Sequence, residues 1–158
     1  MKKITFVLFA LLTCAHSQAS PITGDIEGQA SVIDGDTLEI QGTRIRLHGI
    51  DAPESSQQCY RQGQPWKCGQ WAAQALDTIL KGKHLSCSKK GSSYGRVVAV
   101  CHVIETGQDI AQVMVRGGGA VAARKYSMAY VPAETEAKAK QAGIWSSEFE
   151  MPWDWRKK

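Results

Sequence analysis

Residues 32–54 read VIDGDTLEIQGTRIRLHGIDAPE, and this stretch places acidic side chains and arginines between short apolar runs. Asp34 and Asp36 are two positions apart, so the pattern predicts a strand end and turn with both carboxylates on one face. A second strand then carries Arg46 and runs into residues 51–54, whose proline has no N–H for a strand ladder. Carboxylates therefore stand at both ends of one predicted strand.

The acidic side chains Asp36, Asp51 and Glu54 form a set of hard oxygen ligands suited to Ca²⁺ or Mg²⁺. Arg46 lies between them in the sequence and adds a group that binds phosphate. Each motif taken alone also fits an ordinary turn, but the combination favours a site that binds a cation and a phosphate. Arg46 and Asp51 are five positions apart and would face opposite sides of a regular strand, so we expect the strand to end or bulge near Gly49.

The length of 158 residues and the hydrophobic content of 43% fit one domain with its own core. Residues 1–19 have the layout of a secretory signal peptide, with two lysines, an apolar run over residues 4–12 and small residues before Ala19. The apolar run is shorter than the roughly 20 residues that cross a bilayer. We expect residues 20–158 to be a soluble periplasmic or secreted domain with no membrane partner; lipidation at Cys14 is a weaker alternative.

The charge of the chain is only modestly basic. Removal of the leader with its two lysines leaves 17 basic against 15 acidic residues, a net charge of +2. Attraction to nucleic acid must therefore come from local clusters. The candidates are Lys81, Lys83, Lys89, Lys90 and Arg96, the pair Arg124 and Lys125, and the tail Arg156, Lys157 and Lys158. Solvated surface charge explains each cluster equally well when it is taken alone.

Four cysteines follow the leader: Cys59, Cys68, Cys87 and Cys101. An even number in an exported protein predicts two disulfides, and three connectivities are possible. Zinc is disfavoured because no C-x-x-C pair is present. We favour Cys59 with Cys68, which closes a polar loop over residues 55–67. We also favour Cys87 with Cys101, which bridges two strands around a Gly-Ser turn.

Hydrophobic periodicity predicts five strands and three helices. The strands are expected at residues 26–33, 37–41, 44–50, 85–88 and 97–104, and the helices at 69–80, after an N-cap at Asp109, and from near Pro132 to Gly143. A small closed barrel removes exposed strand edges, although periodicity does not separate it from other α+β folds. The three tryptophans Trp145, Trp153 and Trp155 are interpreted as a tail packed against the barrel.

Three runs in register carry a family resemblance: residues 33–37 (IDGDT), 46–54 (RLHGIDAPE) and 94–96 (YGR). Their order and spacing resemble the signature of the staphylococcal nuclease (thermonuclease) family. The resemblance continues through residues 113–118 (VMVRGG) and 142–145 (AGIW). It implies an α+β fold, a five-stranded OB-fold β-barrel with three α-helices.

The resemblance also implies roles for the acidic residues. Asp36, Asp51 and the carbonyl of Ala52 match the family's Ca²⁺ ligands, and Asp34 supports them without binding the metal. Glu54 matches the position usually regarded as the general base.

Further positions match groups that contact the substrate. Arg46 and Arg96 match two catalytic arginines that grip phosphate. Tyr94, Tyr126 and Arg124 are expected to contact substrate. Arg124 stands where the staphylococcal member has a base-stacking tyrosine, and Ser93 replaces a lysine, so base preference is expected to differ.

The function expected from these residues is that of an exported, Ca²⁺-dependent, sugar-nonspecific endonuclease. It would hydrolyse phosphodiester bonds of DNA and RNA as a monomer and prefer single strands. One alternative is a catalytically silent OB-fold module that binds nucleic acid. Another is a disulfide-stapled, protein-binding domain in which Ca²⁺ is only structural.

Overall fold

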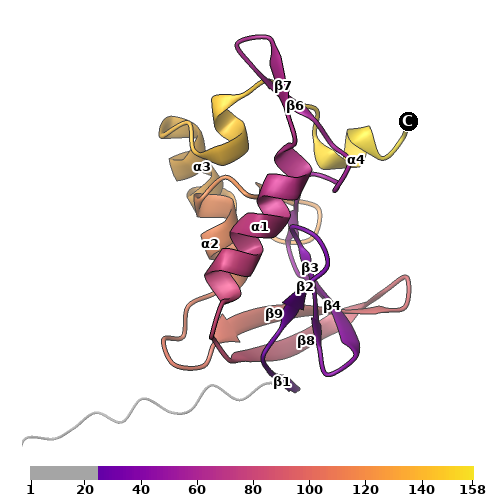
Figure 1. The fold of residues 1–158 in the computed structure, drawn as a ribbon. Coiled ribbons are helices and arrows are strands. Elements are labelled where there is room, and N and C mark those ends of the chain that lie inside the picture. The colour runs from indigo at the N-terminus through magenta and orange to yellow at the C-terminus, as the bar shows by residue number, and fades with distance from the viewer. Residues whose placement is uncertain (1–24) are drawn as a thin grey trace, which may run out of the picture.

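The computed structural model describes residues 25–158, so the predicted leader and Cys14 lie outside the described residues (Figure 1). A six-stranded sheet has the order β1 (Ile26–Gly28), β8 (Leu85–Ser93), β9 (Arg96–Val103), β4 (Thr43–Leu47), β3 (Thr37–Ile40) and β2 (Ser31–Val32). Two small sheets pair β5 (Ile50–Asp51) with β10 (Val121–Ala122) and β6 (Cys59–Arg61) with β7 (Gln64–Trp66). The helices are α1 (Cys68–Leu80), α2 (Ile110–Arg116), α3 (Val131–Ala139), the 3-10 turn η1 (Gly143–Ser146) and α4 (Pro152–Trp155).

The arrangement of the elements confirms the α+β class and is consistent with an OB fold. In the main sheet β4 and β9 are parallel and the other neighbours are antiparallel. Among the described residues the ladders do not close a barrel, because β1 and β2 are the two ends of the sheet. The sequence predicted one strand over residues 26–33, but Gly28 has a φ of 146°, which L side chains rarely adopt, and the chain divides there.

The turns account for two further differences from prediction. Strands β8 and β9 extend to a two-residue turn at Tyr94 and Gly95, both with positive φ, where the sequence predicted a loop over residues 89–93. The polar loop predicted over residues 55–67 contains the β6–β7 hairpin, turned by Gln62 and Gly63. Short polar strands carry little hydrophobic alternation, so periodicity did not reveal them.

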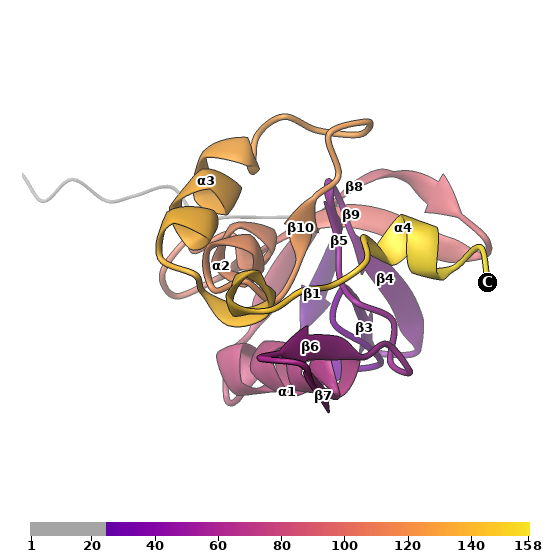
Figure 2. The ribbon, with the colours of Figure 1, turned by 90° about the horizontal axis from the view of Figure 1, so that it is seen from above.

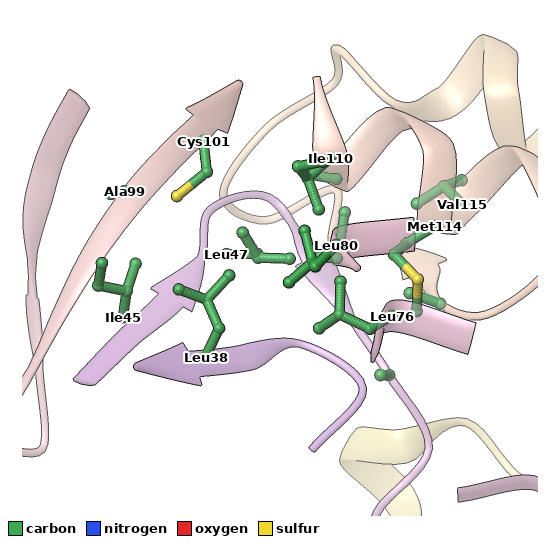
Figure 3. Close-up of a cluster of buried hydrophobic side chains, with 14 of the residues drawn as sticks. Leu38, Ile45, Leu47, Leu76, Leu80, Ala99, Cys101, Ile110, Met114 and Val115 are labelled. Atoms are coloured by element: carbon green, nitrogen blue, oxygen red, sulfur yellow. The ribbon is translucent and has the colours of Figure 1, made fainter. Parts of the chain in front are cut away.

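The core lies between the sheet and the helices. Leu38, Ile45 and Leu47 from the sheet meet Leu76 and Leu80 of α1 (Figure 3). Residues Ile110, Met114 and Val115 of α2 cover the same cluster. Helices α1, α2 and α3 thus gather on one side of the molecule, whereas α4 stands apart from them (Figure 2). This short fourth helix was not predicted.

The local signals for α1 and α2 were read correctly, whereas the helix predicted from Pro132 to Gly143 ends at Ala139 and Gly143 begins η1. The helix predicted over residues 69–80 is α1, and Gly82 follows its end with a φ of 71°. Asp109 caps α2 by accepting a hydrogen bond from the Gln112 N–H at 3.1 Å. None of the helices in residues 25–158 is long and apolar enough to cross a membrane.

Both predicted disulfides are present in the structure. Cys59 is bonded to Cys68, which ties β6 to the start of α1. Cys87 is bonded to Cys101, its direct partner across β8 and β9. Closing loops of this length stabilises a fold by about 2 to 3 kcal/mol per bridge on the chain-entropy model.

Candidate active site

A cavity of 1110 Å³ opens at one end of the sheet. Its lining comes from the turn before β3 (residues 34 and 36), residues 46–54, the β8–β9 hairpin, residues 122–126 and the α4 region. All ten residues predicted for metal, catalytic or substrate roles lie along it. The structure therefore brings the predicted residues, which lie between positions 34 and 126, to one place.

Two buried carboxylates share one arginine at the bottom of this cavity. Asp36 and Asp51 are 3% and 4% exposed. Arg46 donates from Nη1 to Asp36 Oδ1 at 2.9 Å and from Nη2 to Asp51 Oδ1 at 2.7 Å. The Ala52 N–H donates to Asp36 Oδ2 at 2.9 Å, and Asp34 Oδ1 accepts from the Asp36 N–H at 3.0 Å. The two carboxylates consequently lie side by side.

The break in the strand at Gly49 makes this meeting possible, as the spacing predicted. Strand β4 ends at Leu47 and β5 begins at Ile50. Gly49 has a φ of 78°, and a Cβ there would lie 2.8 Å from Ser127 Cβ and from Tyr130 Cε2. Only glycine fits this position, and the turn it makes brings Arg46 and Asp51 to the same side.

The surroundings of Asp36 disfavour its charged form. Burial raises the pKa of Asp36 to about 7, and the neighbouring carboxylates of Asp34 and Asp51 add to that effect. Arg46 and the Ala52 N–H oppose the increase in this pKa but do not cancel it. An additional positive charge at this position would stabilise the ionised carboxylate.

Glu54 is held by its backbone against the start of α1. A Cβ at Gly69 would lie 1.7 Å from the Glu54 carbonyl oxygen, so the close approach requires glycine. The buried Gln57 accepts from the Glu54 N–H at 3.2 Å and donates its own N–H to the Glu54 carbonyl at 2.7 Å. The Glu54 carboxylate is left 37% exposed at the cavity.

The structure adds Arg156, which the sequence assigned to a solvated basic tail. Its guanidinium donates to both oxygens of Asp51, at 3.0 and 2.7 Å, and to Glu54 Oε1 at 2.5 Å. Trp153 from the same segment also lines the cavity and is 37% exposed, where the sequence predicted a packed tail. This contact joins the residue that follows α4 to Asp51 of β5. No local signal identifies this contact, because Arg156 and Asp51 are 105 positions apart.

The second predicted phosphate-binding arginine is differently placed. Arg96 begins β9, opposite Ser93, and lines the cavity. Within residues 25–158 its guanidinium has no hydrogen-bond or ion-pair partner. Tyr94 at the hairpin tip is 96% exposed and Tyr126 is 67% exposed. These groups are accessible to a ligand in the cavity.

Arg124 lines the cavity as well, but its guanidinium is bound by Glu134 of α3 at 2.6 Å. Glu134 is buried and also accepts from the Ala122 N–H and from Lys138 Nζ. Burial acts to raise the pKa of Glu134, but the hydrogen bonds from Arg124, Ala122 and Lys138 outweigh it and hold the pKa below the ordinary 4.5. Glu134, which is held by these hydrogen bonds, in turn holds the guanidinium of Arg124.

We predict that Glu134→Gln lowers the free energy of unfolding by about 2 kcal/mol at pH 7, the scale of lost hydrogen bonds to a charged group. Because the pKa of Glu134 is lowered by folding, its contribution is complete above about pH 4.5 and is lost as the pH falls through the folded-state value. Urea unfolding of parent and variant at pH 7 and pH 3 measures this; the difference should shrink at pH 3. Glu136→Gln, which removes an exposed partner of Arg116, is the control and should change little. A constant difference at both pH values would contradict the assignment.

Comparison with known proteins agrees with this geometry. The family description "Staphylococcal nuclease homologue" matches residues 44–147. The chain belongs to the staphylococcal nuclease family. It is 39% identical over 154 residues to the succinoglycan biosynthesis protein ExoI of Rhizobium meliloti, covering 94% of this chain and 78% of that protein. It is 31% identical over 155 residues to a micrococcal nuclease of Shigella flexneri, covering 87% and 84%. An Escherichia coli protein named an uncharacterized endonuclease is 31% identical, covering 85% and 88%.

Membership of the staphylococcal nuclease family makes the chain a nuclease, a hydrolase of phosphodiester bonds. Nucleases of this family generally depend on a metal. Within residues 25–158 no three His, Cys, Asp or Glu side chains are grouped so as to hold a metal ion. The paired carboxylates of Asp36 and Asp51 nevertheless fit a hard divalent cation, because both are buried and supply hard oxygen ligands. Arg46 and Arg156 provide the positive charge around them.

Proposed function

We propose that the chain is an exported, Ca²⁺-dependent nuclease that cleaves both DNA and RNA, prefers single strands and acts as a monomer. In this proposal residues 1–19 are the signal peptide and residues 20–158 the nuclease domain. The observation that carries it is the convergence of paired carboxylates, an exposed glutamate and two arginines along one cavity. Export is supported by two disulfides, which persist in oxidising compartments.

The residues divide the chemistry of hydrolysis between them. Asp36, Asp51 and the Ala52 carbonyl would hold Ca²⁺, which when bound supplies positive charge to a phosphoryl group. Asp34 fixes the Asp36 loop through its hydrogen bond to the Asp36 N–H. The exposed carboxylate of Glu54 accepts a proton from the attacking water.

The arginines act on the phosphate. The planar guanidinium forks of Arg46 and Arg96 bind phosphoryl oxygens by paired, charged hydrogen bonds and stabilise the charge that develops in the transition state. Arg96 has no competing partner among residues 25–158, so it is available to the substrate. Arg46 already bridges Asp36 and Asp51, so it links the cation ligands to the phosphate.

The preference for single strands follows from the aromatic lining. Tyr94, Tyr126 and Trp153 all lie along the cavity and are exposed. Stacking on aromatic rings tolerates every base and either sugar, but it requires a base that is not already stacked in a duplex. Arg124, held by Glu134, adds positive charge on the same side.

The test is cleavage of single-stranded DNA and RNA by residues 20–158 against free Ca²⁺ and free Mg²⁺. The small number of charged ligands predicts half-maximal activity at about 10⁻⁴ to 10⁻³ M Ca²⁺. Mg²⁺ demands near-octahedral geometry, so the cleavage rate in Mg²⁺ should be at least about tenfold lower than in Ca²⁺. Full activity in Mg²⁺ alone or in excess chelator would exclude the Ca²⁺ assignment. Binding of nucleic acid without cleavage in Ca²⁺ would favour the silent module.

A further inference from the structure

The guanidinium of Arg156 covers the face of Asp51 that lies toward Glu54. It is bidentate to Asp51, and the same Nη1 group also reaches Glu54 Oε1. Its side chain is 40% exposed, so one side of the fork faces the cavity. Arg156 lies outside residues 44–147, the range that the family description matches.

A divalent cation bound to Asp51 and this guanidinium would compete for the same oxygens. Asp51 Oδ1 already accepts from Arg46 and Arg156, and Asp51 Oδ2 accepts from Arg156. Two cations within a few ångströms in a partly buried site repel strongly. Binding of the cation is therefore expected to displace the guanidinium from Asp51.

The backbone near α4 is held independently of Arg156. Gln57 Nε2 donates to the Glu150 carbonyl at 2.7 Å. Tyr60 and Glu148 exchange two backbone hydrogen bonds of 2.8 Å, and Pro152 is buried. The side chain of Arg156 can consequently change partner while α4 stays in place.

We propose that Arg156 is a third arginine of the active site. In the free protein it neutralises Asp51 and Glu54, and when a divalent cation binds Asp51 it turns to the substrate phosphate. This inference rests on the proposed cation site. Arg156 contacts Glu54, the group assigned to activate water, so a displaced guanidinium stays next to the position of the scissile phosphate. A planar fork suits phosphate as well as carboxylate, so the exchange keeps paired hydrogen bonds.

The first experiment measures Ca²⁺ binding by titration calorimetry in the absence of nucleic acid. Arg156→Gln should bind Ca²⁺ at least about tenfold more tightly than the parent, because a competing charge is removed. Lys157→Gln is the matched control: it removes the same charge from the next residue, which pairs with Asp154 outside the cavity, and should leave the affinity unchanged. Arg156→Lys keeps the charge without the fork and should fall between the parent and Arg156→Gln. If the glutamine variant does not fold, the Ca²⁺ affinity of Arg156→Lys tests whether Arg156 competes with the cation.

The second measurement is the KM for a single-stranded oligonucleotide at saturating Ca²⁺. Arg156→Gln should raise KM at least about fivefold. Lys157→Gln should raise it less than about twofold, because salt screens the loss of a single exposed charge. Unchanged or weaker Ca²⁺ binding in the Arg156 variants overturns the inference while leaving the proposed function intact. Tighter Ca²⁺ binding with an unchanged KM overturns the transfer to phosphate. Failure of the parent and all variants to bind Ca²⁺ overturns both this inference and the Ca²⁺ assignment.

Discussion

Glu54→Gln is expected to lower cleavage at saturating Ca²⁺ by at least about a hundredfold, the scale of a lost proton-transfer group. Glutamine has the same shape but does not accept a proton from water. The backbone of residue 54 is held by Gln57 and by packing on Gly69, so the loop should keep its position. Folding and Ca²⁺ affinity should remain close to those of the parent.

The measurement is single-turnover cleavage of single-stranded DNA, with the melting temperature and Ca²⁺ titration as checks on integrity. Glu150→Gln is the control, because the Glu150 carboxylate pairs with Lys158 and does not line the cavity. It should cleave within about twofold of the parent, as expected for an exposed ion pair. An unchanged rate for Glu54→Gln would remove Glu54 from the mechanism.

Arg46→Lys and Arg96→Lys are each expected to lower cleavage by about a hundredfold, because an ammonium does not reproduce the bidentate fork. The structure predicts that they differ in a second property. Arg46 bridges Asp36 and Asp51, so its replacement should also change Ca²⁺ affinity. Arg96 has no partner within residues 25–158, so Arg96→Lys should leave Ca²⁺ affinity unaltered.

Cleavage rates and Ca²⁺ titrations of the two variants test this distinction. Arg44→Lys is the matched control on β4, because Arg44 is exposed, pairs with Glu39 and lies outside the cavity. It should behave like the parent in both assays. Parental cleavage by either active-site variant would show that arginine to be structural. Equal Ca²⁺ affinities in the Arg46 variant and the parent would show that the bridge does not organise the cation ligands.

Much of the fold and of the site could be predicted because the signals are local. The glycine after α1, the cap at Asp109 and the break at Gly49 each depend on a few neighbouring residues and on backbone conformations that those residues favour. Sequence motifs in register also located ten residues along one cavity. The favoured disulfide pairs, each of which closes a short loop, are the ones that the structure contains.

By itself, the sequence determined the family, the α+β class and ten of the residues that line the site, and it favoured the correct disulfide pairs. Only the tertiary structure decided that β1 and β2 lie at opposite ends of the sheet, that Glu134 binds Arg124 and that Arg156 binds Asp51. The physical reason is that the local sequence around a tail arginine is the same whether its side chain is solvated or paired with a distant carboxylate. Its partner is chosen by the packing of Glu148, Glu150 and Pro152, which places α4 against residues about a hundred positions away.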